Sequence, residues 1–213
     1  GQIVDVVDNL VIDGATVTIN GILNNSDGYS IDIINGGKLI IGGALATFTN
    51  DGAITVEATD SAIAAGSESI QIKDGAKFVN NGTVMLESST EAASYLMSNS
   101  GIIDNNGSIE IVDGVMSNNG TINNKAGAVF TISGTFTADS TSTFNNSGSV
   151  VVNGTISGDG ATIGNVAEGA TVTVSNVTGK ITVSDSNLES KRTLETGNNT
   201  IALNSTNTTE SVG

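Results

Sequence analysis

Short stretches of alternating apolar and polar residues, each followed by asparagine, aspartate or glycine, repeat along the chain. A period of two places successive side chains on opposite faces of a strand, and asparagine and glycine tolerate the backbone conformations of sharp corners. The pattern predicts an all-β protein of short strands with frequent corners. The clearest predicted strands are Ala15–Ile19, Tyr29–Ile34, Ala53–Val56, Ser69–Lys73, Ser108–Val112, Ala128–Ile132, Ser149–Val152, Thr171–Val174 and Lys180–Val183.

The chain also repeats itself internally. The segment from Phe48 (FTNDGAITVEATDSA) aligns with the segment from Phe78 (FVNNGTVMLESSTEA) at an offset of 30 residues. The shared unit is a corner motif, Asn-x-Gly-x-(Ile/Val), whose successive glycines are 30, 25, 13 and 28 residues apart. A fixed motif at irregular spacing is typical of stacked coils whose corners accept insertions, and an asparagine repeated at a corner can stack on the next one. The predicted corner residues are Asn50, Gly52, Asn80, Gly82, Asn105, Gly107, Asn118, Gly120, Asn146 and Gly148.

Antiparallel hairpins are the structural alternative, because each Asn-Gly pair suits a two-residue hairpin turn. A sandwich or meander, however, has no reason to reuse one corner chemistry at unequal spacings. We therefore predict a single elongated parallel β-solenoid over residues 1–187, best supported over 48–157. Residues 188–213 are predicted to form a C-terminal cap or assembly segment with a polar tail.

Two segments interrupt the strand pattern at equivalent places of the aligned repeats, Thr59–Gly66 and Ser88–Ser98. The second begins with Ser88-x-x-Glu91, which has the form of a helix capping box. A short helix and a loop over a corner are both compatible with these insertions.

Units such as GAKFVNNGTVML, IIDNNGSIEIV, MSNNGTINN and FNNSGSVVVNGTISG resemble the passenger domains of Gram-negative autotransporters and related surface adhesins. The resemblance covers residues from roughly Phe48 to Ser157, about half of the chain. It implies a right-handed parallel β-helix displayed outside the cell, often for adhesion or self-association. Surface-layer subunits and extracellular filament proteins share this composition and remain alternatives.

Composition agrees with a narrow core and an exposed surface protein. Hydrophobic residues make up 38% of the chain and are mainly β-branched or small, whereas aromatic residues make up 3%. The balance of 22 acidic and 7 basic residues gives a net charge of −15, so nucleic-acid binding is not expected. No run approaches the ~20 apolar residues of a membrane helix, so no membrane insertion of this chain is expected. We expect an extracellular or cell-surface location.

The residues needed for most catalytic chemistry are missing. The sequence contains no His and no Cys, which excludes a Ser-His-Asp triad, a cysteine nucleophile and nitrogen or sulfur metal ligands. A glycosidase would need two nearby carboxyls, for which Glu57 and Glu87 occupy matched repeat positions, and a lyase would need a base such as Lys73 or Lys77. We predict no enzyme, no catalytic residue and no cofactor, with a carbohydrate-binding or carbohydrate-active β-helix as the alternative.

Calcium is the one metal that acidic, oxygen-rich corners would suit, at Asn25–Asp27 or Asp185–Glu189. Neither segment matches an EF-hand loop, so no metal ligand is predicted. Ten Asn-x-Ser/Thr sequons occur, and the candidates for glycosylation are Asn198, Asn204 and Asn207 in the polar tail.

The sequence thus predicts a non-enzymatic structural or adhesive protein. Its β-solenoid rod is expected to form a homo-oligomer or polymer by end-to-end contact, giving a filament or a surface layer. A host or surface glycan is the further partner that such an adhesive rod would contact.

Overall fold

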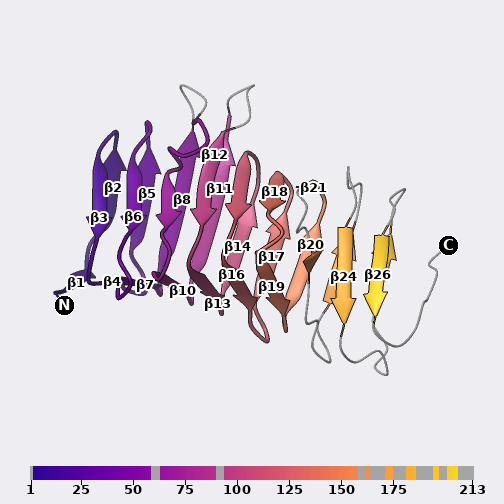
Figure 1. The fold of residues 1–213 in the computed structure, drawn as a ribbon. Helices are drawn as coiled ribbons and strands as arrows, with labels where there is room; N and C mark the ends of the chain where they lie inside the picture. Colours follow the sequence, from indigo (N-terminus) through magenta and orange to yellow (C-terminus); the bar gives the residue numbers. More distant parts are fainter. Residues whose placement is uncertain are drawn as a thin grey trace.

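The computed structural model describes residues 2–58, 63–89 and 94–157 in full, and beyond residue 157 the backbone of five short strands. The described residues form 26 strands and no helix, so the part of the chain that the structure describes holds no helical segment able to cross a membrane. The strands lie side by side along one axis and form an elongated rod (Figure 1).

Most strands belong to three long sheets, and a short fourth sheet follows. Sheet 1 contains β1 (Ile3–Val6), β4 (Ile22–Asn25), β7 (Thr47–Asn50), β10 (Lys77–Asn80), β13 (Ile102–Asn105), β16 (Thr121–Asn124) and β19 (Thr143–Asn146). Sheet 2 contains β2 (Leu10–Asp13), β5 (Ser30–Ile34), β8 (Ala53–Ala58), β11 (Thr83–Ser88), β14 (Ser108–Ile111), β17 (Val129–Ile132), β20 (Ser149–Val152), β23 (Thr171–Val174) and β25 (Leu194–Thr196). Sheet 3 contains β3 (Thr16–Ile19), β6 (Lys38–Ile41), β9 (Ile70–Ile72), β12 (Tyr95–Asn99), β15 (Val115–Asn118), β18 (Thr135–Ala138) and β21 (Thr155–Ser157). Sheet 4 contains β22 (Thr162–Ile163), β24 (Ile181–Asp185) and β26 (Ile201–Ser205).

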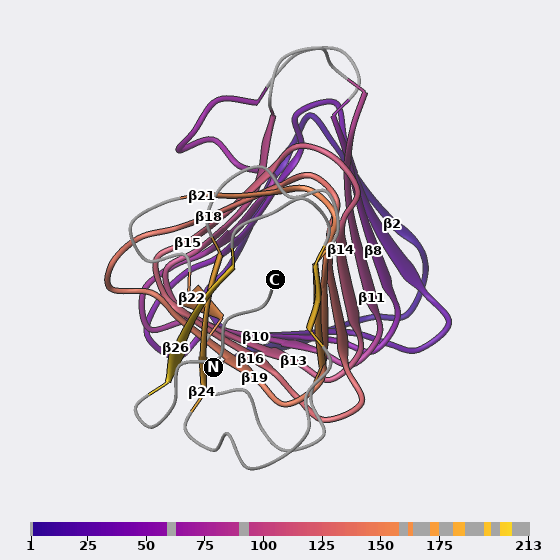
Figure 2. The same cartoon turned by 90° about the vertical axis from the view of Figure 1, so that its right-hand side faces the viewer.

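Each of the first seven coils contributes one strand to sheet 1, one to sheet 2 and one to sheet 3, and neighbouring coils pair in parallel. Figure 2 looks along the axis from the C-terminal end: the chain passes from sheet 1 below to sheet 2 on the right and sheet 3 on the left while advancing toward the viewer. This sense of rotation is right-handed, as expected for crossovers between parallel strands. The predicted right-handed parallel β-solenoid is confirmed. The antiparallel alternative is wrong, because all strand pairings of the described chain are parallel.

The register of the coils reproduces the internal repeat. Phe48 pairs with Phe78 across β7 and β10, and Val56 pairs with Leu86 across β8 and β11. In-register stacking places like residues above one another inside the rod, and the rings of Phe48 and Phe78 stack with centroids 5.2 Å apart. Most of the other inward columns hold aliphatic side chains, and because these also stack in register they fill the narrow core with few aromatic rings.

Three other phenylalanines show how narrow the core is. Phe130, Phe136 and Phe144 come from sheets 2, 3 and 1, and their rings meet edge to face with centroids 5.2 to 6.1 Å apart. One aromatic from each sheet therefore spans the interior at this level. All five phenylalanines of the sequence are buried.

The two insertions lie together at the corner between sheets 2 and 3. Ile63 N donates to Ser94 Oγ at 3.2 Å, and Tyr95 N donates to Ile63 O at 2.9 Å. Strand β12 begins at Tyr95, so the final residues of the second insertion are extended rather than helical. Residues 59–62 and 90–93, including Glu91 of the capping-box sequence, lie outside the described part.

Beyond residue 157 the described strands continue the parallel stacking. Strand β23 pairs with β20 and β25, and β24 pairs with β22 and β26. The strands β25 and β26 fall within the segment 188–213 that the sequence assigns to a cap. The predicted boundary at residue 187 stays a prediction.

Candidate functional site: corner ladders and the open first coil

Four predicted corner asparagines stand in one column where sheet 1 turns into sheet 2. Their buried side chains belong to a ladder of six, in which each Nδ2 donates to the Oδ1 of the next coil at 2.7 to 2.9 Å. The ladder consists of Asn25, Asn50, Asn80, Asn105, Asn124 and Asn146. A buried amide needs partners for its polar atoms, and stacking supplies them along the axis.

The glycine two residues later allows the coils to approach one another closely. A Cβ built on Gly82 would lie 1.9 Å from the carbonyl oxygen of Gly52, and one built on Gly107 would lie 2.1 Å from that of Gly82. Any larger residue there would push neighbouring coils apart. The Asn-x-Gly motif thus combines a buried amide with a corner that leaves no room for a side chain.

Asn118 lies in a different corner from the other four predicted asparagines. It ends β15, where sheet 3 turns into sheet 1, and its Oδ1 accepts a bond of 2.8 Å from Asn99 Nδ2 of the preceding coil. This explains the short spacing of 13 residues between Gly107 and Gly120, because these two glycines occupy two different corners of one winding, separated by the corner between sheets 2 and 3, rather than equivalent corners of two coils.

The sequence interpretation missed three ladder members, Asn25, Asn99 and Asn124. Asn99 does carry the motif, with Gly101 two residues later, and could have been found by it. Asn25 and Asn124 precede longer corners and lack the motif. Their only signal is that each is the last inward-facing residue of its strand, two positions after a buried apolar residue.

The ladders end where their columns change residue type. Asn25 Oδ1 and Asn118 Nδ2 are buried and have no hydrogen-bond partner within the described residues. Val6 stands next to Asn25 in the register, and Ala138 stands next to Asn118. Both neighbours are apolar, so each ladder stops on an unsatisfied amide atom at a cost in stability.

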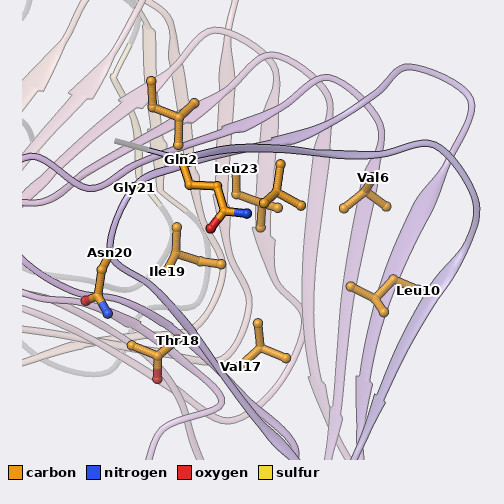
Figure 3. A pocket seen from close by; sticks show the side chains of 11 residues that line it. Gln2, Val6, Leu10, Val17, Thr18, Ile19, Asn20, Gly21 and Leu23 are labelled. Atoms are coloured by element: carbon orange, nitrogen blue, oxygen red, sulfur yellow. The ribbon is translucent and has the colours of Figure 1, made fainter.

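No described residue of this chain covers the outer side of the first coil. Strands β1, β2 and β3 each pair only with β4, β5 and β6 within the described residues, so the other edge of each carries unpaired backbone groups. Beside these edges opens a hollow of about 650 Å³. Figure 3 shows its side chains, which come from the first coil and the start of the second. Its apolar lining comprises Val4, Val6, Leu10, Val17, Ile19, Ile22 and Leu23.

Apolar side chains are exposed around this hollow. Val4 occupies the same inward column as Leu23 and Phe48, yet 47% of it is exposed, whereas those two are buried. Outside the hollow, Ile3 and Val11 on the outer faces of β1 and β2 and Val7 in the corner between them are exposed at 61%, 55% and 66%. The core of the solenoid therefore reaches the surface at this end, which is unusual for residues of this kind.

The charged side chains are spread over the outer faces. Glu57 and Glu87 stand side by side on sheet 2, as the repeat alignment predicts. Lys77 lies on sheet 1, where its Nζ is 2.6 Å from Asp104 Oδ2, and Lys125 approaches the other oxygen at 3.6 Å. Partial burial raises the pKa of Asp104, but hydrogen bonds from Lys77 and Asn123 and the two ammonium charges outweigh it. The pKa of Asp104 therefore lies below its usual value.

A second, shallower hollow of about 570 Å³ lies at the corner between sheets 1 and 2. Tyr29, Asp27, Asp51 and Asn9 contribute to its lining over a floor of Gly52 and Gly82. It adjoins the predicted calcium segment Asn25–Asp27, but the described residues hold no group of three or more His, Cys, Asp or Glu arranged for a metal ion.

The remaining predicted sites fall largely beyond the described side chains. Asp185 and Asn204 lie in β24 and β26, of which only the backbone is described. Asn198, Asn207 and residues 186–189 lie outside the described part of the chain. Their assignments stay predictions.

No protein-family model, no curated protein and no solved structure matches this chain. The arguments about function therefore depend on the geometry and the sequence themselves.

Proposed function

We propose that this chain is a non-enzymatic, extracellular structural or adhesive protein whose rods join end to end into a filament or a surface layer. The observation that carries the proposal is the first coil, which combines three unpaired strand edges with an exposed apolar hollow. The resemblance to autotransporter passenger domains supports display at a cell surface, as does the strongly acidic composition.

Unpaired edges and exposed core residues favour the addition of another coil. A strand edge offers a row of free N–H and C=O groups that another chain can pair with, and apolar residues gain free energy when covered. Both features occur on the same end of the rod. An added coil would continue all three sheets and cover Val4 at the same time.

A second copy of the chain is the occupant that fits this end. Coils of this sequence already stack on one another throughout the described rod, so their cross-sections and strand directions match. At the far end β25, β26 and β21 are the last described strands of their sheets and run parallel to the others. Joining that end to the first coil is a heterologous contact, which repeats into a fibre when it does not close into a ring.

The test compares two substitutions of exposed apolar residues. V4D places a carboxylate in the hollow of the first coil, whereas I102D places one on the outer face of sheet 1 in the fifth coil, where Ile102 is 42% exposed. We expect wild type and I102D to form filaments or sheets in negative-stain images and V4D to remain as short rods. Circular dichroism checks that all three are folded. Short monodisperse rods of the wild type at high concentration would contradict the proposal.

Carbohydrate binding is a second candidate, favoured by the hollow beside Tyr29. An aromatic ring with neighbouring carboxylate and amide groups suits a neutral sugar, because the ring covers a sugar face and the polar groups bind hydroxyls. Y29A should abolish any binding of neutral oligosaccharides in isothermal titration, while Y95A should not. Absence of binding by the wild type removes this candidate.

A further inference from the structure

Six Asn-Gly pairs occur in the described part of the chain, and the backbone N–H of their glycines is not equally engaged. At three corners it donates to the preceding coil: Gly82 to Asn50 O at 3.0 Å, Gly107 to Asn80 O at 3.0 Å and Gly154 to Ile132 O at 2.9 Å. At a fourth, Gly120 N donates to Asn118 Oδ1 at 3.3 Å. In all four pairs the glycine nitrogen is therefore engaged in a hydrogen bond, three to the preceding coil and one within its own corner.

Asn35 and Gly36 differ from these four pairs. They form a tight turn closed by Gly37 N and Ile34 O at 2.8 Å, with φ values of 51° and 74°. Both residues are exposed, and Gly36 N donates to no acceptor in the described part of the chain. Asn35 and Gly37 contact the first coil, whereas a Cβ built on Gly36 would meet no atom within 4 Å, so the backbone nitrogen of Gly36 is accessible to solvent.

Asn20 and Gly21 form the remaining pair. Gly21 N also has no acceptor among the residues described. Gly21 is nevertheless only partly exposed, and Gln2 lies so close to it that a Cβ built on Gly21 would overlap Gln2 O. Gly36 is therefore the one glycine of the six pairs in the described chain that is exposed and whose nitrogen donates no hydrogen bond.

We propose that Asn35 is a site of spontaneous deamidation. The deprotonated nitrogen of Gly36 attacks Cγ of Asn35, a C–N bond forms, and the Cγ–Nδ2 bond breaks as ammonia leaves with the proton. The resulting succinimide is opened by water at either carbonyl, which gives aspartate or isoaspartate. Water is the only other reactant, and glycine favours the step because it has no side chain to hinder ring closure.

The structure also indicates what the modification would change. Asn35 Nδ2 donates to Asp13 Oδ1 at 2.9 Å, which links the first two coils at the corner between sheets 2 and 3. Deamidation replaces this donor with a carboxylate opposite another carboxylate, so attraction becomes repulsion. The first coil would be held less firmly. The modification itself does not depend on the proposed function.

The test follows deamidation at each asparagine in the full chain at mildly alkaline pH by peptide mass mapping with isoaspartate detection. We expect Asn35 to react at least about fivefold to tenfold faster than Asn81, Asn106, Asn119 and Asn153, the factor set by opening one backbone hydrogen bond. Asn20 should react at an intermediate rate. In urea-unfolded chain the rates should converge, because the sequence pair is the same. Equal rates in the folded chain, or a persistent difference after unfolding, would overturn the proposal.

Discussion

The middle coils and the first coil are built from the same three-strand unit but differ in what covers them. From Phe48 to Val152 each coil lies between two others, its inward side chains are buried, and its sheet 1 corner carries a stacked asparagine. The first coil is covered on one side alone, exposes Val4, and has Val6 where the later coils have asparagine. Stability in such a rod comes from contacts between neighbouring coils, so the outermost unit is the weakest unless something caps it.

This comparison predicts that a substitution's cost depends on the coil that contains it. F78A removes a ring that stacks on Phe48 inside the rod, and should lower the free energy of unfolding by about 3–5 kcal/mol. V4A, in the same column of the first coil, should cost less than about 1 kcal/mol because the side chain is half exposed. Urea unfolding of both variants at low protein concentration, where contacts between rods are disfavoured, measures the difference. Similar costs at the two positions would mean that the first coil is covered in solution.

The asparagine ladder gives the next largest effect. In N80A, Asn50 Nδ2 loses an acceptor and Asn105 Oδ1 loses a donor, although Asn50 keeps its bonds to Gly52 O and Thr83 O. Because both atoms are buried, we expect a loss of about 2 kcal/mol or more in thermal or urea unfolding. N119A serves as the control, since Asn119 is an exposed corner residue. If both variants melt alike, the ladder is not a source of stability.

Extending the asparagine ladder into the first coil should make that coil more like the middle coils and stabilise the chain. V6N places an amide next to Asn25, whose Oδ1 is buried without a partner. A hydrogen bond from the new Nδ2 to that oxygen should raise the free energy of unfolding by about 0.5–1.5 kcal/mol. V6A is the control, because alanine offers no donor. A melting temperature of V6N below that of V6A would show that the corner of the first coil cannot adopt the geometry of the later ones.

The ion pairs of Asp104 should give the smallest effect. Its pKa is lowered in the folded chain, so the stability it contributes is present above the pKa of the unfolded chain and is lost as the pH falls through the folded value. Because Lys77 and Lys125 are partly exposed, less than about 1 kcal/mol is expected. D104N should therefore reduce the loss of stability as the pH falls below about 4, the ordinary pKa of an aspartate. If the stability of D104N depends on pH in the same way as that of the wild type, the ion pairs of Asp104 do not stabilise the fold.

Much of the fold could be predicted because parallel stacking repeats sequence in register. The offset of 30 residues between Phe48 and Phe78 is the observed strand register, and Ser149–Val152 and Thr171–Val174 match β20 and β23 residue for residue. In a stacked coil each residue's environment is set by the residue above it. Similar residues at fixed positions after a corner therefore reveal the neighbours directly.

The corners and the open end were harder to predict. Coils differ in length, with successive ladder asparagines 25, 30, 25, 19 and 22 residues apart, so a motif search could not separate the two kinds of corner. The motif search missed Asn124 because the corner that follows it is longer and has no glycine two residues after the asparagine. The hollow at the first coil depends on which strands have no partner on one side, and that is decided by pairing rather than by any local pattern.

Hydrogen exchange of the first coil at increasing protein concentration tests the central claim most directly. If a second copy covers this end, the amides of residues 2–21 should become more protected as concentration rises, while those of residues 77–124 stay unchanged. The protection should disappear in V4D and persist in I102D. Exchange in the first coil that does not depend on concentration, in a chain that remains folded, would contradict end-to-end assembly through this surface.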